Sequence, residues 1–214
     1  MRLLIASQNP GKIKEIQAIF KAIKPLAGKR FSFLEDLELV TTNDLDIHID
    51  VDETGQSYAE NAALKVLAFY KASKLITLAD DSGLEVSILD GAPGLHSARY
   101  APQPGATDAD RRAYLLQQLE CLPRPWGARF HCTVAVADRE GVLHYAEGNC
   151  PGEIIPEERG THGFGYDPIF LLTELGRTMA EMSMAEKNQL SHRARALQAS
   201  LPMLQEIYEM EKRT

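Results

Sequence analysis

The chain lacks long apolar segments and contains few cysteines. Its longest uninterrupted apolar runs contain about five residues, whereas a membrane-spanning helix needs roughly 20. The first apolar run meets Ser7-Gln8-Asn9-Pro10 too early for the hydrophobic region of a signal peptide. The three cysteines (Cys121, Cys132 and Cys150) are odd in number and lack CxxC spacing, which argues against a disulfide framework and a zinc site. We therefore expect a cytoplasmic protein with reduced thiols and no membrane segment.

An excess of positive charge is also missing. The chain has 30 acidic residues against 23 Lys and Arg, which gives a formal net charge of −7. Affinity for DNA or RNA comes mainly from Lys and Arg on phosphates, so we expect no nucleic-acid partner. A small polyanion is still compatible with this charge, if local cations and a metal ion bridge the carboxylates to phosphate. The 44% hydrophobic composition is enough for one sizeable core, or for two lobes that share one sheet.

The first third of the chain predicts a strand, a polar loop and two helices. Residues 2–6 read as a short buried strand, and the turn-rich segment 7–12 follows it. Apolar residues then recur at helical spacing from Ile13 to Ile23. Residues 31–51 are expected to contain one or two strands. A second helix is predicted for 57–72, because Ser57-x-x-Glu60 matches a capping box.

The remainder predicts further alternation of strands and helices, with one hairpin. The predicted elements are a strand at 76–79 ending at two acids, an apolar stretch at 84–89, a turn at 91–94, a helix at 107–120, a linker at 123–127, a hairpin at 129–146, a glycine-rich loop at 160–167, an apolar run at 169–172, and helices starting near Ser183 and Ser191. This order predicts the α/β class, with a mixed sheet flanked by helices in a single domain of residues 1–214.

The segment Ser7–Lys12 is a candidate phosphate site. A loop between a strand and a helix presents backbone N–H groups and the positive end of the helix dipole. Asn9 adds an amide, Ser7 a hydroxyl and Lys12 a point charge. The Walker pattern G-x-x-x-x-G-K-[ST] is absent, so an ordinary strand-to-helix turn is the alternative interpretation of this segment.

The sequence Asp80-Asp81-Ser82-Gly83 is a candidate metal site. Two acids after a buried strand place carboxylates where open α/β sheets bind ligands. Mg²⁺ is the usual cation beside phosphate, since it prefers oxygen ligands and is held by one or two carboxylates. Glu53, Glu60 and Asn61 are further oxygen ligands if the fold brings them close. The alternative is a solvated acidic turn.

Two later motifs offer aromatic rings and hydrogen-bond donors. Gly163-Phe164-Gly165-Tyr166-Asp167-Pro168 lets a flat ligand approach the backbone, and Phe164 or Tyr166 is suited to stack on a base. Ser191-His192-Arg193 sets two donors at a helix start, although the dipole disfavours cations there. Lys187 precedes them by about one helical turn. A tight turn with a core aromatic and a polar helix entry are the structural alternatives.

Taken in this order, these motifs resemble those of the inosine triphosphate pyrophosphatase family. The resemblance covers nearly the whole chain. Its motifs are Ser7-x-Asn9-x-x-Lys12, Glu53-Thr54-Gly55, Glu60-Asn61-Ala62 with Lys65, Ala79-Asp80-Asp81-Ser82-Gly83-Leu84, Gly91-Ala92-Pro93-Gly94 through Ser97-Ala98-Arg99-Tyr100, Gly163–Pro168, Glu186-Lys187 and Ser191-His192-Arg193. Small departures are Ser7, where Thr is common in the family, and His162, where a glycine often stands.

The resemblance implies two lobes around a long central sheet with an active-site cleft between them, and a homodimer. It implies hydrolysis of ITP, dITP and XTP to the monophosphate and pyrophosphate, with Mg²⁺. Asp81 matches the catalytic acid, and Glu53 with Asp81 matches the metal ligands. The positions that match substrate-binding residues are Ser7, Gln8, Asn9, Pro10, Gly11, Lys12, Lys65, Ser82, Phe164, Gly165, Tyr166, Asp167, Lys187, His192 and Arg193.

Base selectivity follows from donors and acceptors. Hypoxanthine and xanthine present an acceptor at position 6, whereas adenine presents an amino donor that would face the donors of His192 or Arg193. Whether Asp81 acts as a general base or as a metal ligand stays open. The competing interpretations are a related pyrophosphatase with another base preference, a phosphoribosyltransferase and a nucleotide-sensing protein without catalysis. The last is expected to lack Asp81 or Lys12, and both are present.

Overall fold

The computed structural model describes residues 1–26 and 28–213. Its strands are β1 Arg2–Ile5, β2 Glu38–Thr41, β3 Ile76–Val86, β4 Trp126–Ala137, β5 Leu143–Ile154, β6 Phe170–Leu172 and β7 Arg177–Thr178. Its α-helices are α1 Pro10–Ile23, α2 Tyr58–Ser73, α3 Asp108–Leu119, α4 Met184–Leu190 and α5 His192–Arg213, with short 3₁₀ helices η1 Gly28–Leu34, η2 Ser87–Leu89, η3 Gly94–Arg99, η4 Asp167–Ile169 and η5 Met179–Glu181.

The strands of the described residues form one mixed sheet. Its order is β2-β1-β3-β4-β5-β6-β7. Strand β1 pairs in parallel with both β2 and β3, with Leu3 opposite Ile76 and Ile5 opposite Leu78. Strand β6 pairs antiparallel with β5 and β7. The predicted α/β class with a mixed sheet is therefore confirmed.

The chain divides into two compact units. Unit 1 contains residues 1–81, 132–148 and those from 193 onward, and unit 2 contains residues 82–131 and 149–192. Strands β3, β4 and β5 each contain residues of both units.

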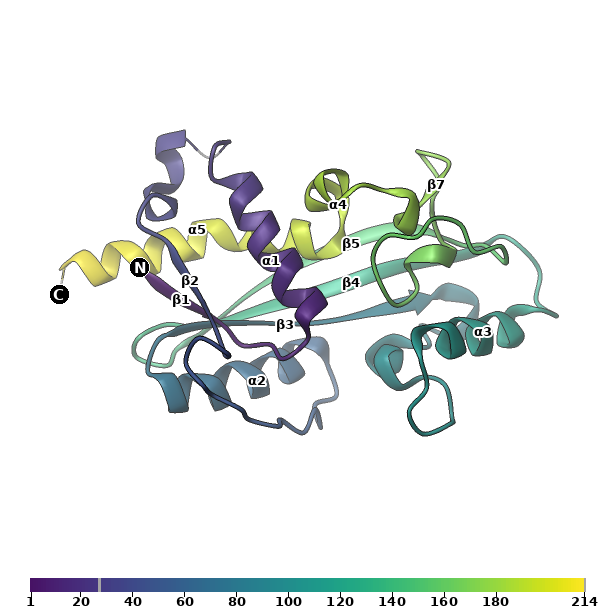
Figure 1. Cartoon of the computed structure of the whole chain (residues 1–214), viewed down its shortest axis with the longest axis horizontal. Helices are drawn as coiled ribbons and strands as arrows, with labels where there is room; N and C mark the ends of the chain where they lie inside the picture. Colours follow the sequence, from purple (N-terminus) through teal and green to yellow (C-terminus); the bar gives the residue numbers. More distant parts are fainter. Residues whose placement is uncertain (27, 214) are drawn as a thin grey trace. The chain divides into compact units, whose positions relative to one another are not determined.

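In unit 1, helices cover both faces of the strands. Helices α1 and α5 lie on one face and α2 lies on the other (Figure 1). The first face buries Leu78 of β3 among residues of α1 and α5, such as Ile16 and Leu201. The opposite face buries Ala79 of β3 against Val66 of α2. Successive residues of β3 therefore point to opposite helical layers, as the two-residue period of a strand requires.

Unit 2 has its own core. Leu84 at the end of β3 packs with Leu115 of α3, Phe130 of β4 and Phe170 of β6. The Phe130 and Phe170 rings lie 4.5 Å apart between centroids. Tyr166, from the glycine-rich loop, belongs to the same cluster. The glycine-rich loop, which contains predicted site residues, is thus attached to this core through Tyr166.

Two predicted boundaries next to candidate site residues are wrong. The strand predicted for 76–79 continues through Asp80-Asp81-Ser82-Gly83 to Val86, so the two acids lie within β3 and not beyond its end. The apolar residues on both sides of the acids are buried, which extends one strand across the polar positions. The polar loop predicted for 7–12 is also shorter, because α1 begins at Pro10 and Asn9 is its N-cap. Proline favours the first helical position, where its missing N–H costs nothing.

Most of the other predicted elements are confirmed. Thr107 and Ser183 form complete capping boxes at α3 and α4, and α5 follows Ser191. At α2, Ser57 accepts the N–H of Glu60, but the Glu60 carboxylate accepts from Gln56. The hairpin is longer than predicted, since β4 starts at Trp126.

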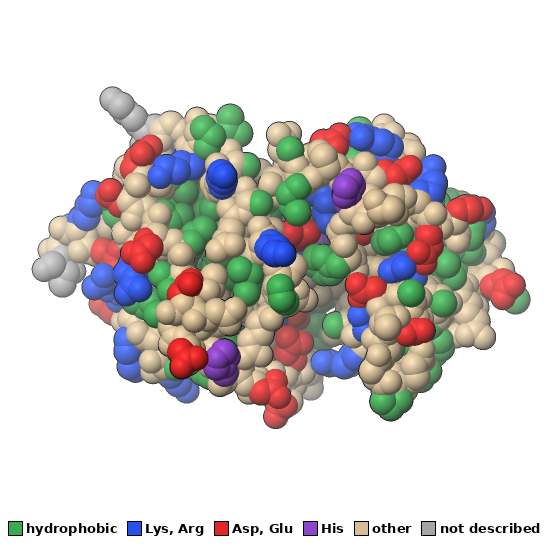
Figure 2. All heavy atoms as spheres, in the orientation of Figure 1, with side chains coloured by type: hydrophobic (Ala, Val, Ile, Leu, Met, Phe, Trp, Pro, Cys, Tyr) green, Lys and Arg blue, Asp and Glu red, His purple; other side chains and the backbone are tan. Residues whose placement is uncertain are grey.

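The surface charges, the helices and the cysteines were each compared with the expectations from composition. Acidic and basic side chains are interspersed over the face shown in Figure 2. In the part of the chain that the structure describes, no helix combines the length and apolar character needed to cross a bilayer. Cys121 is exposed, Cys132 and Cys150 are buried, and all three are free thiols.

Candidate functional site

The two adjacent acids of β3 lie in different surroundings. Asp80 follows Leu78 on the face covered by α1 and α5, whereas Asp81 follows Ala79 on the face covered by α2. Both side chains are nearly buried, with exposed fractions of 3% and 6%. Buried carboxylates need charged or hydrogen-bonding partners. Each acid has its own set, all of it within unit 1.

Asp80 is surrounded by cations. Its Oδ2 accepts from Nε and Nη2 of Arg193, at 3.1 and 3.0 Å, and lies 3.2 Å from Nζ of Lys12. Burial alone would raise the pKa of Asp80, but Arg193, Lys12 and Lys65 together hold it well below its usual range. Asp80 is therefore an ionised anchor for two cations, and one of them is the predicted phosphate-binding Lys12.

Arg193 is held by a second acid. Its Nη1 forms an ion pair with Oε2 of Glu15, a buried residue of α1. The Arg193 side chain is only 2% exposed, and its fork bridges Glu15 and Asp80. Sequence reasoning did not find Glu15. A carboxylate one helical turn after Lys12, on the apolar side of an amphipathic helix, was the available signal.

Asp81 lies in a ring of polar groups from α2 and the preceding loop. Its Oδ1 accepts from Nζ of Lys65 at 3.0 Å, and its Oδ2 accepts from Nδ2 of Asn61 at 3.3 Å. Lys65 also donates to Oε1 of Glu53 at 3.0 Å. Burial raises the pKa of Asp81 above its usual value, although Lys65 and Lys12 oppose the shift.

Asn61 aligns this group. Its Oδ1 accepts the N–H of Gly55 at 2.8 Å, while its Nδ2 donates to Asp81. A Cβ at Gly55 would lie 2.7 Å from that Oδ1, so a larger residue there would displace Asn61. The segment Glu53-Thr54-Gly55 is thereby tied to Asp81. We call Lys12, Glu53, Asn61, Lys65, Asp80, Asp81 and Arg193 the acid–cation cluster.

The predicted phosphate segment lies next to this cluster in unit 1. Asn9 caps α1, since its Oδ1 accepts from the N–H groups of Gly11 and Lys12 at 2.9 and 3.2 Å. Ser7 accepts the N–H of Asn9 through Oγ at 3.2 Å. Asn9 and its neighbours Gln8 and Pro10 are exposed. The N–H groups of Gly11 and Lys12, which were expected to be open for phosphate, therefore already donate to Asn9. A phosphate would have to share these donors with Asn9 or displace its side chain.

In unit 2, the predicted base-binding segment Gly163–Pro168 forms what we call the aromatic loop. Oδ2 of Asp167 accepts from Nζ of Lys187 at 2.8 Å and from the N–H of Phe164 at 3.1 Å. Both charged side chains are buried, with exposed fractions of 6% and 7%. A Cβ at Gly163 would lie 2.0 Å from that same Oδ2, so only glycine fits there.

The two aromatic rings of the loop differ in access. Tyr166 is 4% exposed, packs in the unit 2 core and donates its hydroxyl to the carbonyl of Ser97 at 2.9 Å. Phe164 is 37% exposed, with Nζ of Lys187 5.8 Å from its ring centroid. The structure therefore leaves Phe164, and not Tyr166, with a face that a flat ligand can reach.

The remaining predicted residues lie on or beside core elements. His192 is 8% exposed, and its ring stacks on Phe130 with centroids 4.7 Å apart. Ser82 is half-buried in β3, directly after Asp81.

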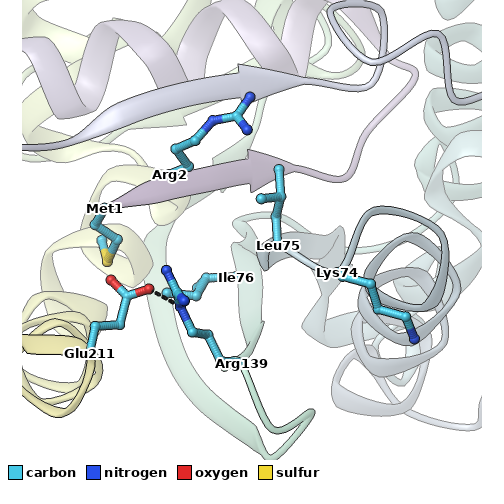
Figure 3. Close-up of a pocket in the computed structure, with 7 residues that line it drawn as sticks. All are labelled: Met1, Arg2, Lys74, Leu75, Ile76, Arg139 and Glu211. Atoms are coloured by element: carbon cyan, nitrogen blue, oxygen red, sulfur yellow. Dashed lines mark hydrogen bonds and ion pairs between the residues drawn. The ribbon is translucent and has the colours of Figure 1, made fainter. Parts of the chain in front are cut away.

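A surface pocket lies at the other end of the parallel strands in unit 1. It has a volume of about 290 Å³ and is lined by Met1, Arg2, Lys74, Leu75, Ile76, Arg139 and Glu211 (Figure 3). Arg139 and Glu211 face each other there as an ion pair. The pocket adjoins the amino-terminal ends of β1 and β3, whereas ligands of α/β sheets bind at the carboxyl ends. It contains none of the predicted site residues.

The comparisons with known proteins identify the family. The model of the Ham1 family matches residues 3–203. A dITP/XTP pyrophosphatase of Desulforamulus reducens is 40% identical over 209 residues, covering 97% of this chain and 98% of the relative. The chain belongs to the Ham1 family.

Further relatives of this Ham1-family chain support its fold. A dITP/XTP pyrophosphatase of Geobacillus kaustophilus is 44% identical over 196 residues, covering 91% of this chain and 90% of the relative. The solved structure of a HAM1 protein from Coxiella burnetii aligns with a TM-score of 0.81 and 35% identity, over 96% of this chain and 99% of that one. The resemblance inferred from the motifs is thereby confirmed at the level of family and fold.

Proposed function

We propose that this chain hydrolyses deaminated purine nucleoside triphosphates (ITP, dITP and XTP) to the monophosphate and pyrophosphate, which clears them from the nucleotide pool. One observation supports the proposal most strongly. Asp81, buried and with a raised pKa, lies within hydrogen-bond reach of Lys65 and Asn61 in a chain whose relatives are named dITP/XTP pyrophosphatases. A basic carboxylate among cations is suited to activate water beside a polyphosphate.

The reaction is a displacement at the α-phosphorus. The oxygen of a water molecule bonds to the α-phosphorus while the bond to the oxygen bridging the β-phosphorus breaks. Asp81 accepts the proton of that water, and pyrophosphate leaves with the bonding electrons. Lys12 and Lys65 are the cations assigned to charge on the phosphates, and the segment Ser7–Lys12 is assigned to the triphosphate.

The acid–cation cluster fits a divalent metal of the magnesium type. Glu53 and Asp81 both approach Nζ of Lys65 at 3.0 Å, so two carboxylates converge where positive charge is favoured. Oδ1 of Asp80 is buried without a hydrogen-bond partner among the described residues. No set of three or more His, Cys, Asp or Glu side chains in residues 1–26 and 28–213 is arranged to hold a metal. Mg²⁺ is normally held by one or two carboxylates together with substrate phosphates.

When bound, Mg²⁺ supplies a Lewis acid that neutralises phosphate charge. Glu53 and Asp81 are the residues assigned to hold it, as the family resemblance implies. Asp81 thereby combines a ligand role with its place next to the attacking water.

Base recognition is assigned to unit 2 and to the start of α5. Phe164 offers a ring face for stacking, Asp167 and Lys187 contact Phe164, and Gly165 and Tyr166 follow it in the loop. Ser82 is assigned to the substrate by the family resemblance alone. His192 and Arg193 are the proposed donors to the 6-oxo group. An adenine amino group would leave such a donor unpaired, at about 1–3 kcal/mol for each buried group.

The assembly follows from the same resemblance. Both units are proposed to act as one domain, residues 1–214, within a cytoplasmic homodimer. The three free thiols are compatible with a reducing compartment. Light scattering on the purified chain tests the dimer, which a mass near that of one chain, 23.7 kDa, would exclude.

Product analysis with a panel of substrates tests the function. Purified protein is incubated with ITP, XTP, GTP, ATP and dTTP, with and without Mg²⁺, and pyrophosphate and orthophosphate are measured separately. We expect strong Mg²⁺-dependent pyrophosphate release from ITP and XTP, and much slower release from GTP, ATP and dTTP. Orthophosphate as the product would exclude attack at the α-phosphorus, and equal turnover of all five would exclude selection for deaminated purines.

A further inference from the structure

The middle of the aromatic loop is held by helix α3. Oδ2 of Asp108 accepts the N–H of Gly165 at 2.8 Å, and Nη1 of Arg112 donates to the carbonyl of Gly165 at 2.9 Å. Both backbone groups of one residue therefore bond to charged side chains one helical turn apart. All three residues belong to unit 2.

Both α3 side chains are themselves fixed. Nε and Nη2 of Arg112 donate to the two oxygens of Glu158 at 2.8 and 2.9 Å, a bidentate pair that sets the plane of the guanidinium. Arg112 is 12% exposed, so this pair is partly shielded from water. Asp108 pairs through Oδ1 with Arg111, which also donates to the carbonyl of Ala106 at 2.6 Å.

The position of these bonds matters because of what flanks Gly165. Tyr166 is anchored in the core by Ser97, and the N–H of Phe164 is held by Asp167. Gly165 has a left-handed backbone with φ of +62°, and a Cβ there would meet nothing within 4 Å. Glycine is therefore favoured at this position because of the left-handed backbone, and not because a side chain would clash with a neighbour. A flexible glycine next to an exposed ring needs external bonds to keep that ring in one orientation.

We propose that Asp108 and Arg112 are positioning residues that lock Gly165 and thereby fix the Phe164 ring for stacking on the base. This rests on the proposed function in one respect, namely that the aromatic loop contacts the base. Neither α3 residue touches the substrate. By restricting the conformations of the loop before the substrate binds, they lower the entropic cost of binding. Their effect should therefore appear in substrate affinity.

The first test measures whether Asp108 and Arg112 restrict the backbone of Gly165. Amide hydrogen exchange of Gly165 is followed by NMR in the wild type, Asp108→Ala, Asp108→Asn and Arg112→Gln. We expect faster exchange in Asp108→Ala, because the acceptor of this N–H is lost, and partial restoration in Asp108→Asn, which keeps an oxygen. Unchanged exchange in Asp108→Ala would overturn the proposal.

The second test measures the consequence for catalysis. Arg112→Gln should raise KM for ITP about tenfold, the change that corresponds to one lost charge-assisted hydrogen bond. It should leave kcat within about twofold and leave competitive inhibition by tripolyphosphate, which lacks a base, unaltered. Arg129→Gln is the matched control, since Arg129 forms an ion pair with Glu85 at 2.6 Å in the same unit and does not contact the loop.

The outcomes separate the two proposals. If exchange at Gly165 accelerates but KM for ITP stays at the wild-type value, the positioning role is wrong. An equal loss of kcat, KM and tripolyphosphate binding would indicate general damage to the fold and would also contradict it. If the wild type hydrolyses no nucleoside triphosphate, the proposed function fails, while the exchange data still decide whether α3 locks the loop.

Discussion

The acid–cation cluster of unit 1 and the aromatic loop of unit 2 are built in different ways. In the cluster, side chains hold side chains, and buried acids are balanced by Lys12, Lys65 and Arg193. In the loop, side chains hold backbone, because Asp167, Asp108 and Arg112 bond to N–H and carbonyl groups of Phe164 and Gly165. A charged cluster can stabilise a polyphosphate and its reaction, whereas a fixed backbone can present a ring. The comparison predicts effects on turnover from the first region and on affinity from the second.

The largest expected effect is at Asp81. Asp81→Asn keeps the size and the hydrogen bond to Asn61 but removes the base, so kcat for ITP should fall by about 10²- to 10⁴-fold. KM should change little. Steady-state pyrophosphate release measures this, with Asp90→Asn, an exposed acid at a left-handed position that suits asparagine, as the control. A variant that loses less than tenfold in kcat would remove Asp81 from the chemistry.

Two variants of Arg193 test its role in stability and its proposed role in base selectivity. Arg193→Ala leaves Asp80 and Glu15 buried without their shared cation, which should lower the free energy of unfolding by about 3–5 kcal/mol. Urea denaturation measures the loss, and Arg213→Ala, at an exposed position of the same helix, should stay within about 0.5 kcal/mol of the wild type. The more conservative Arg193→Lys keeps the charge. Its ITP-to-ATP ratio of kcat/KM should narrow if Arg193 also reads the 6-oxo group, and an unchanged ratio would refute that role.

Phe164 tests the second region. Phe164→Ala removes the exposed ring and should weaken substrate binding by about 1–3 kcal/mol, the usual contribution of one base stacked on an aromatic side chain. The change should appear in KM with little effect on kcat. Leu175→Ala removes an apolar side chain of similar exposure in the same unit and should leave KM unaltered. A fall in kcat at constant KM would contradict the division of roles.

The smallest effect concerns the helix that bears Lys187. Hydrogen bonds from Arg177, then from the N–H and hydroxyl of Ser183, lower the pKa of Glu186 to about 2. A folded-state pKa below the unfolded value of 4.5 means that this stabilisation is complete above about pH 4.5 and is lost as pH falls toward 2. The melting temperature of Glu186→Gln should therefore fall less steeply than that of the wild type between pH 4.5 and 2. Parallel slopes would show that the cap contributes nothing.

Much of the fold could be predicted from the sequence. The helix starts near Thr107 and Ser183 were predicted correctly, because helix caps depend on local hydrogen bonds. The continuation of β3 was missed, because Asp80-Asp81-Ser82-Gly83 has the composition of a turn and only its partners in space keep it extended. Assigning the strand as a whole would have shown that Asp80 and Asp81 point to opposite faces.

The partners of the site residues were harder to predict. Glu15 pairs with Arg193, which is 178 residues away in the sequence. Asp108 and Arg112 of α3 bond to Gly165, which lies in a distant loop of the sequence. No local pattern encodes such bonds. The choice between Phe164 and Tyr166 likewise depended on burial, since both rings stand in the same glycine-rich motif and only Tyr166 enters the core. The motifs therefore predicted which residues to place in the candidate site, but not which partners orient each of them.

The most direct test of the account is a double-mutant analysis of Asp81→Asn and Phe164→Ala with ITP and ATP. We predict that the first lowers kcat for both substrates alike and that the second raises KM for ITP. Their effects on the activation free energy calculated from kcat/KM should add within about 0.5 kcal/mol. Strong non-additivity, or an Asp81→Asn effect confined to KM, would contradict the proposal that the acid–cation cluster governs turnover while the aromatic loop governs affinity.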